Sequence, residues 1–414
     1  MFPQRPTPMA ASRPDISASR LEPAPAWLSD PATVAVMDAL AAAGGGDAAR
    51  FVGGCIRNSL TGHLVDDVDI ATPLTPEAVI AALAKAGLKS VPTGVEHGTV
   101  TAISAGRPFE VTTLRRDVET DGRRAVVAFT TDWSEDAQRR DFRLNAIYAD
   151  REGRLFDPTG QGVADARAGR IVFVGDAQTR VREDYLRILR FFRFFAWYGQ
   201  GPPDPVAVEA CAALTDGLAT LAAERVSKEL LKLLAAPDPK AAVALMKSTG
   251  VLAAVLPGAD DLAVFDALAA LDPDPLLRLA ALTPDAAKTA TALRLSNAQR
   301  DRLIAATAQA LDAPPNARAA RRLLYAIGAQ AYADRIKLAW ARLGGDWSES
   351  LRLADGWARP VLPITGGDAA EAGLTPGPAM GAALRAVEAW WIDEDFAPGR
   401  DAVLARLRAS SPPP

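Results

Sequence analysis

The stretch Gly53–Thr72, "GGCIRNSLTGHLVDDVDIAT", decides how this chain is interpreted. It begins with a glycine pair that opens a predicted helix, and it ends in an apolar predicted strand that carries Asp67 and Asp69. Side chains alternate across a strand, so these two carboxylates should project from the same face. Close carboxylates repel each other unless cations lie between them, and hard oxygen ligands suit Mg²⁺. An isolated pair of this kind is more often a solvated edge strand, but the apolar neighbours favour a metal site.

A third carboxylate follows in a second predicted strand. The segment "PFEVTTLR" places Glu110 among apolar neighbours in the same small sheet. Two Mg²⁺ ions about 3.5–4 Å apart could activate an attacking hydroxyl and stabilise a leaving pyrophosphate. We therefore predict that Asp67, Asp69 and Glu110 are the catalytic and metal-binding residues.

The glycine turn is suited to phosphate. Gly53 and Gly54 allow the backbone to approach a ligand closely. The helix that opens at Cys55 directs free N–H groups and a positive dipole end at an anion, and Arg57 adds charge-assisted hydrogen bonds. A glycine pair before a helix is usually only a tight turn. Followed at this distance by two aspartates, it predicts a triphosphate site beside a metal.

A second cluster, "RRDFRLNA", brings Arg139, Arg140, Asp141 and Asn145 within two helical turns. Arg140 suits a phosphate and Asp141 suits a ribose hydroxyl. The alternative is an ion-pair cluster at the start of a helix.

A third cluster, "REDYLRILRFFRF", places Asp184, Arg187 and Arg190 at spacings of three, which predicts one helical face. The intervening Leu186, Leu189 and Phe192 should pack inward. The alternative is a salt-bridge ladder on the protein surface.

Composition sets limits on the class of protein. The chain has 414 residues and a net charge of −4, which excludes a generally basic nucleic-acid binder. No apolar run approaches the roughly 20 residues that a membrane span needs. Its two cysteines, Cys55 and Cys211, lie far apart and suggest neither disulfides nor zinc, which favours the cytoplasm.

Periodicity predicts an α+β fold. Residues 1–26 are rich in Pro, Ser and Ala, and we expect a disordered tail there. Helix and strand signals alternate from Thr33 to Asp157, which predicts a head with a small mixed sheet and helices. From Asp176 onward the pattern is helical almost throughout, broken by Pro and Gly pairs.

These motifs, in this order, resemble the class II nucleotidyltransferases of the tRNA CCA-adding and bacterial poly(A) polymerase type. The resemblance covers roughly residues 50–234 and rests on "GGCIRN", "DVDIAT", "FEVTTLR", "RRDFRLNA", "FDPTGQGVADARAGRI", "REDYLRILRFFRF" and "ERVSKEL". The segment "LPITGGDAAEAGLTPGPAMGAAL" is similar to part of the family's tail, with looser matching. One departure is Asn58, where the family usually has Asp.

The resemblance implies a nucleotidyltransferase head, residues 27–156, followed by an elongated all-α neck, body and tail. The neck, residues 157–235, would recognise the base, and the body and tail, residues 236–414, would bind the tRNA acceptor arm. It implies that Asp67 and Asp69 hold Mg²⁺. The residues implied to contact the nucleotide's phosphates, sugar and base are Gly54, Arg57, Arg140, Asp184 and Arg187.

The predicted activity is addition or repair of the 3′-terminal CCA of tRNA with CTP and ATP as substrates, by a monomer that binds no membrane. A poly(A) polymerase, or an enzyme that adds only CC or only A, remains an alternative. The stretch "RRDVETDGRR" resembles the flexible loop of complete CCA enzymes and favours full activity. An inactive tRNA-binding module would not need Asp67, Asp69 and Glu110. An antibiotic-modifying nucleotidyltransferase would not be expected to have the long helical body.

Overall fold

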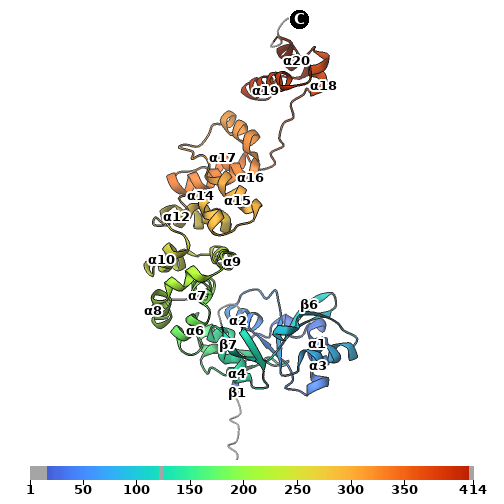
Figure 1. Ribbon diagram of the computed structural model, residues 1–414, viewed down its shortest axis with the longest axis vertical. Coiled ribbons are helices and arrows are strands. Elements are labelled where there is room, and N and C mark those ends of the chain that lie inside the picture. The colour runs from blue at the N-terminus through green and yellow to red at the C-terminus, as the bar shows by residue number, and fades with distance from the viewer. Residues whose placement is uncertain (1–15, 121–124, 410–414) are drawn as a thin grey trace, which may run out of the picture. The chain divides into compact units, whose positions relative to one another are not determined.

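The computed structural model describes residues 16–120 and 125–409, and its contacts divide the chain into two compact units. The first unit is Met1–Pro257 and the second is Gly258–Pro414 (Figure 1). The predicted α+β class is confirmed, with a mixed sheet near the N-terminus and helices beyond it. The head and neck that the sequence separates at residue 156 pack within the first unit. Residues 121–124 of the stretch resembling the flexible loop lie outside the described residues.

A mixed sheet forms the head. Within the described residues its strand order is β1-β10-β9-β2-β3-β6-β5-β4, and only β3 and β6 run parallel. The strands are β1 (Ile16–Arg20), β2 (Arg50–Val52), β3 (Asp69–Thr72), β4 (Lys89–Gly94), β5 (Thr99–Ser104), β6 (Arg107–Thr113), β9 (Tyr148–Ala149) and β10 (Arg154–Phe156). The ribbon β7 (Arg115–Thr120) with β8 (Ala125–Phe129) pairs separately.

Local sequence explains the helices that cover this sheet. Helix α1 (Pro31–Gly44) begins with Asp30, whose carboxylate accepts a hydrogen bond from the Ala32 N–H, and with proline at the first helical position. Helix α3 (Pro76–Lys85) begins in the same way after Thr75. Both helices pack on β5 and β6 and on each other. Helix α2 (Gly54–Thr61) lies against β2.

The prediction of a disordered tail over residues 1–26 is wrong for its second part. Residues 16–20 form β1, which pairs antiparallel with β10, and Leu21 is buried. Residues 1–15 lie outside the described residues. The prediction of disorder rested on the composition of this segment alone. The unpaired backbone groups of an edge strand can nevertheless bind and order a segment from elsewhere in the chain.

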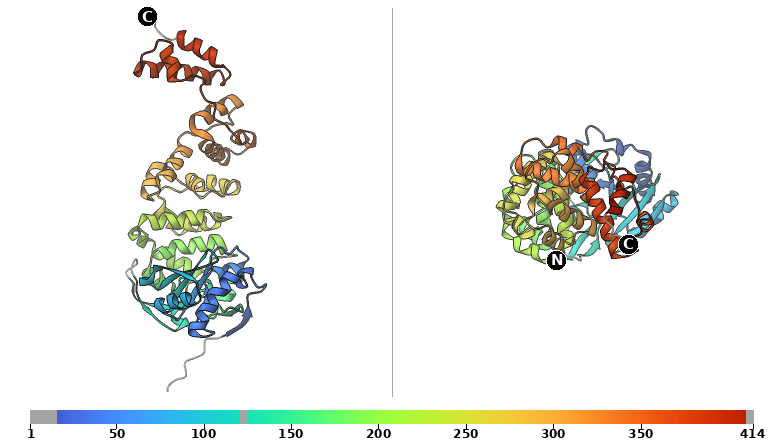
Figure 2. Two further views of the ribbon diagram at one scale, coloured as in Figure 1. Left: turned by 90° about the vertical axis from the view of Figure 1, so that its right-hand side faces the viewer. Right: turned by 90° about the horizontal axis from the view of Figure 1, so that it is seen from above.

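Helices follow the sheet in the first unit. Helix α7 packs against both α9 and α10 (Figure 2). The remaining helices of the first unit, in chain order, are α4 (Trp133–Gln138), α5 (Gly162–Arg167), α6 (Ala177–Glu183), α7 (Leu186–Tyr198), α8 (Pro205–Ala213), α9 (Ala223–Leu234), α10 (Lys240–Ser248) and α11 (Val251–Val255). Short 3-10 turns lie at η1 (Ala26–Leu28), η2 (Val95–His97), η3 (Arg143–Asn145) and η4 (Thr215–Thr220).

An aromatic cluster joins the head to α7. Phe142 is fully buried, with its ring centroid 4.9 Å from that of Phe173 and 5.0 Å from that of Phe194. The predicted inward face of α7 is confirmed, because Leu186, Leu189 and Phe192 are all buried. These contacts fix the "RRDFRLNA" segment against α7.

The second unit is helical throughout its described residues. Its longest helix, α16, is broken at Gly328, whose φ of 80° and ψ of 164° are not helical. No helix in the described part of the chain is long and apolar enough to span a membrane. The helices are α12 (Ala263–Leu271), α13 (Pro275–Leu282), α14 (Ala286–Ala292), α15 (Asn297–Thr307), α16 (Ala317–Leu343), α17 (Ser348–Arg352), α18 (Gly366–Glu371), α19 (Pro378–Asp393) and α20 (Arg400–Ala409).

Candidate active site

The glycine turn brings three functional groups together. Strand β2 ends at Val52, and Gly53 turns the chain into α2 with a φ of 72°, a value that glycine adopts without strain. A Cβ atom added to Gly53 would lie 3.8 Å from Asp69 Oδ2 and 3.9 Å from Arg140 Nη1. The turn therefore sets the N-terminus of α2 beside an acid of β3 and an arginine of the "RRDFRLNA" segment.

Two of the predicted acids are neighbours in the sheet. Asp69 of β3 lies opposite Glu110 of β6 in parallel register, which confirms the prediction that Glu110 belongs to a strand of the same sheet. Burial, together with the negative charges of Glu110 and Asp67, raises the pKa of Asp69 to about 6, and Arg140 and Arg57 offset only part of this rise. Uncompensated negative charge of this kind fits a bound cation.

The prediction that Asp67 and Asp69 lie in the same strand is wrong. Strand β3 begins at Asp69, so Asp67 does not belong to it. The last pair between β2 and β3 joins Val52 to Asp69, and at Gly53 the chain leaves the sheet, so β2 offers no partner to earlier residues. Asp66 and Asp67 are exposed. In the described ranges, no group of three His, Cys, Asp or Glu residues is placed to hold a metal ion as it stands.

A cavity of about 490 Å³ opens beside these acids and is lined mainly by arginines. It brings together every residue that the sequence predicts to bind the nucleotide, although their roles stay predictions. Those residues are Gly53, Gly54, Arg57, Arg140, Asp141, Asn145, Asp184, Arg187 and Arg190.

Arg57 is held from two sides. Its Nη1 donates to Asn145 Oδ1 at 2.6 Å and its Nη2 donates to the Tyr198 hydroxyl at 2.9 Å. The guanidinium lies 4.3 Å from the Tyr198 ring centroid. Burial lowers the pKa of Arg57. A cation fixed and desolvated in this way interacts strongly with an anion that enters the cavity.

Asp141 organises the cavity wall. Its carboxylate accepts hydrogen bonds from Asn145 Nδ2 at 2.9 Å and from Arg190 Nε at 2.7 Å. Burial opposes ionisation, but the Arg190 charge and these hydrogen bonds outweigh it and hold the pKa of Asp141 well below its usual range. The sequence assigns Asp141 to a ribose hydroxyl, and here both of its oxygens already have protein partners.

Arg140 is clamped in the same manner by α4. Its Nη2 donates to Asp136 Oδ2 at 2.9 Å, and that carboxylate also accepts from the Tyr148 hydroxyl at 2.7 Å. Burial opposes ionisation of Asp136, yet Arg140, Arg139 and Tyr148 lower its pKa to about 2. The clamp fixes the Arg140 guanidinium beside Gly53.

The third cluster does not form one helical face, so that part of the prediction is wrong. Helix α6 ends at Glu183, and Asp184 is extended, with φ of −156° and ψ of 106°. The Asp184 carboxylate accepts from the Leu186 N–H at 3.1 Å, which favours a fresh start of α7 over a continuous helix. Asp184, Arg187 and Arg190 nevertheless all line the cavity.

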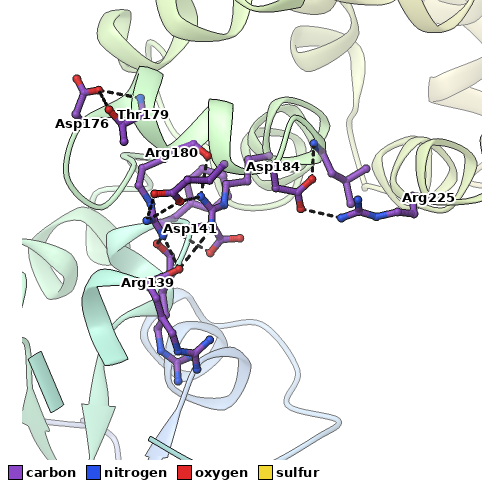
Figure 3. A network of polar contacts seen from close by, with 12 residues as sticks. Arg139, Asp141, Asp176, Thr179, Arg180, Asp184 and Arg225 are labelled. Carbon is purple, nitrogen blue, oxygen red and sulfur yellow. Dashed lines mark hydrogen bonds and ion pairs between the residues drawn. The ribbon is translucent and has the colours of Figure 1, made fainter. Parts of the chain in front are cut away.

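Asp184 and Arg187 both have partners in the protein (Figure 3). Asp184 Oδ2 accepts from Arg225 Nη2 of α9 at 2.7 Å. Arg187 forms an ion pair with Glu183 and donates to the Arg180 carbonyl at 2.7 Å. Each Asp184 oxygen keeps a further lone pair for a ligand.

The sequence prediction missed Arg193, Phe194 and Arg225, which also line the cavity. Arg193 continues the spacing of three beyond Arg190 and could have been included on that signal. Arg225 lies 41 residues beyond its partner Asp184, and no local pattern joins them.

Comparisons with known proteins identify the family of this chain. A model described as "Poly A polymerase head domain" matches residues 49–172, and one described as "Probable RNA and SrmB-binding site of polymerase A" matches residues 203–262. The mouse protein "CCA tRNA nucleotidyltransferase 1, mitochondrial" is 32% identical, with 87% of this chain and 86% of that protein covered. The "CCA-adding enzyme" of Geobacillus stearothermophilus is 40% identical over 51% of each chain.

A solved structure matches over nearly the whole chain. It is the crystal structure of the Bacillus stearothermophilus CCA-adding enzyme in complex with CTP. The TM-score is 0.77 at 29% identity, with 91% of this chain and 96% of that chain covered. Fold and site together define a nucleotidyltransferase. The chain belongs to the family of CCA-adding tRNA nucleotidyltransferases, which shares its head domain with the poly(A) polymerases.

Proposed function

We propose that this protein adds or repairs the 3′-terminal CCA of tRNA, using CTP and ATP. The observation that carries the proposal is the juxtaposition of the Asp69–Glu110 pair with an arginine-lined cavity through the Gly53 turn. Seven of the described lining residues of that cavity are arginines, which suits a triphosphate.

The reaction is a nucleotidyl transfer. The 3′-hydroxyl oxygen of the RNA attacks the α-phosphorus of the nucleotide and forms a new P–O bond. The bond from that phosphorus to the oxygen bridging to the β-phosphate breaks, pyrophosphate leaves with the electron pair, and the hydroxyl proton passes to water. Such transfers depend mainly on positioning and charge stabilisation, so no covalent nucleophile is needed.

Two groups of residues share this work. Asp69 and Glu110, with Asp67 on the preceding segment, would hold Mg²⁺, which when bound stabilises charge on the reacting phosphates. Arg57 and Arg140, both fixed by protein partners, would bind the triphosphate beside the N-terminus of α2.

The base would be selected by Asp184 and Arg187. The carboxylate accepts from the amino group that cytosine and adenine share, and the guanidinium donates to the adjacent ring nitrogen. Uracil and guanine present the reverse pattern. One pair of side chains can thus accept CTP and ATP and reject UTP and GTP without a template.

We further propose that residues 27–156 are the catalytic head, residues 157–235 the base-reading neck, and residues 236–414 the surface that binds the tRNA acceptor arm. We expect a monomer in the cytoplasm, although the mouse relative is named as mitochondrial. Two buried free cysteines are compatible with a reducing compartment.

The experiment supplies tRNA that ends before CCA with CTP, ATP or both, and reads product length on a sequencing gel. Addition of two residues with CTP alone and of three with both nucleotides is expected. A long adenosine tail with ATP alone would establish a poly(A) polymerase instead. No extension of any RNA, with Mg²⁺ present, would overturn the proposal.

A further inference from the structure

A second cavity adjoins the arginine-lined one. It has a volume of about 500 Å³ and lies between the segment after α2 and the helices α7 and α9. Six of its lining residues carry the argument: Asn58, Leu64, Arg193, Trp197, Tyr198 and Lys232. None of them belongs to the predicted nucleotide-binding set. A volume of this size falls in the range of small-ligand sites.

The two cavities share one lining residue. Arg193 lines both of them. The second cavity also contains Asp66, the residue before Asp67, and Asn58, the residue after Arg57. A group bound in the second cavity therefore lies beside the segment that carries Asp67 and next to the residues that hold Arg57.

The walls of the second cavity are predominantly apolar and aromatic. Leu64 is 86% exposed and lines the cavity. Trp197 presents an indole, and the Tyr198 ring packs edge-on against His63 with centroids 4.9 Å apart. Flat apolar walls of this kind suit a nucleobase, because stacking of a base on an aromatic side chain contributes about 1–3 kcal/mol.

One cation at this cavity is available to a ligand. Within the described part of the chain, the Lys232 ammonium forms no ion pair or hydrogen bond. Arg193 donates from Nε to Glu229 Oε2 at 2.5 Å, so its charge is largely compensated, and Asp66 is the acid of the lining. A single free ammonium suits one backbone phosphate and is too little for a triphosphate.

Hydrogen bonds hold these walls in place. Asn58 Nδ2 donates to the Leu64 carbonyl at 2.6 Å, while its Oδ1 accepts from the Tyr198 hydroxyl at 3.2 Å. Only an amide can do both, so the departure from the family's usual Asp secures the Leu64 wall. Trp197 Nε1 donates to the Lys232 carbonyl at 2.7 Å, which fixes the indole next to the free ammonium.

We propose that this second cavity binds the 3′-terminal nucleotide of the RNA that is being extended. Its base stacks on Trp197 beside Leu64, and Lys232 contacts its backbone phosphate. The inference rests on the proposed function, because it names the place of the acceptor end in the same reaction.

The test compares Trp197→Ala, Trp197→Phe and Lys232→Ala with the wild type. Trp197→Ala and Lys232→Ala should raise KM for tRNA lacking CCA by about five- to hundredfold and leave KM for CTP unchanged. Trp197→Phe keeps a stacking ring and should stay within about threefold of the wild type. Lys85→Ala, which removes an exposed lysine of α3 away from both cavities, controls for net charge.

A binding measurement accompanies the kinetics. A tRNA whose 3′-terminal nucleotide is 2-aminopurine should lose fluorescence on binding the wild type and Trp197→Phe, because stacking quenches it. Equal quenching by Trp197→Ala would overturn the inference, as would a rise in KM for CTP instead of tRNA. Absence of any nucleotide addition by the wild type would instead refute the proposed function, and the inference would fall with it.

Discussion

The carboxylate of Asp69 lies half-buried beside Glu110 in the sheet and two residues after Asp67. Its pKa of about 6 lies above the unfolded value, so the ionised form costs folding free energy. That cost is absent below about pH 4, grows between pH 4 and 6, and is complete above pH 6. Asp69→Asn should therefore raise the free energy of unfolding at pH 7.5 by on the order of 1–2 kcal/mol, allowing for solvent screening.

Denaturant unfolding in EDTA at pH 7.5 and at pH 4.5 measures this effect, which should be much smaller at the lower pH. The same variant should lose nucleotide addition by several orders of magnitude. Asp66→Asn is the matched control, because Asp66 is exposed and should change stability by less than about 0.5 kcal/mol. A less stable Asp69→Asn protein at pH 7.5 would contradict the account of the charge cluster.

Base selection is also predicted to depend on single residues. Arg187→Ala and Asp184→Ala should lose the preference for CTP and ATP over UTP and GTP along with rate, because a site built on paired hydrogen bonds rejects mismatches by roughly 10⁴-fold or more. Relative kcat/KM values for the four nucleotides provide the measurement. Arg182→Ala, an exposed neighbour that pairs with Gln178, is the control. Wild-type preference in both variants would place the base reader elsewhere.

Single residues were predictable where the signal was local. The Gly53 turn follows from two adjacent glycines between a strand and a helix, and the structure has it in place. The ion-pair partners of the charged residues in the cavity could not be predicted from the sequence. The Asp184–Arg225 pair spans 41 positions, and the Arg190–Asp141 pair spans 49, so folding of distant segments decides them.

At the level of elements, α7 is fixed to the head through Phe142, which is fully buried against Phe173 and Phe194. Phe142→Ala should lower the free energy of unfolding by about 3–5 kcal/mol, through lost burial and the cavity left behind. Because Phe142 adjoins Asp141, the variant should also raise KM for CTP.

Urea unfolding followed by tryptophan fluorescence and circular dichroism measures the change. The unfolding transition of the first unit should move to a lower urea concentration, because Phe142 belongs to that unit. The transition of the second unit should not change. Phe142→Leu keeps most of the apolar volume and should lose roughly half as much. An equal shift of both transitions would contradict the division into two units.

Elements with strong periodicity were predicted well, and their ends were not. Leu186, Leu189 and Phe192 identified the buried face of α7. The break before it depends on one hydrogen bond from the Leu186 N–H to Asp184, which hydrophobic spacing does not encode. Likewise β3 begins only at Asp69, where its pairing with β2 also ends, and hydrophobic spacing does not encode that limit.

For the molecule as a whole, the net charge of −4 makes the binding of RNA a matter of local arginines and lysines. Binding of tRNA should weaken steeply between 50 and 200 mM salt, because each phosphate contact releases counterions, whereas a stacking contribution should be insensitive to salt. Filter binding across that range measures the slope. Lys232→Ala should reduce it by about one unit, and Trp197→Ala should leave it unchanged. A flat slope in the wild type would contradict binding through phosphates.

Cys55 has a practical consequence. Its thiol is buried 3.3 Å from the Val52 carbonyl and 3.9 Å from that of Asp69 in β3, and burial raises its pKa to about 12. Cys211 is buried in α8 and is likewise protonated. Neither thiol should react with a maleimide unless the structure around it opens. The labelling rate of each cysteine therefore measures the rate of local unfolding around it. Mass spectrometry of the two labelled peptides would measure local unfolding at Cys55, beside the mixed sheet, and at Cys211, in α8, in one sample. CTP with Mg²⁺ should slow the labelling of Cys55 more than that of Cys211.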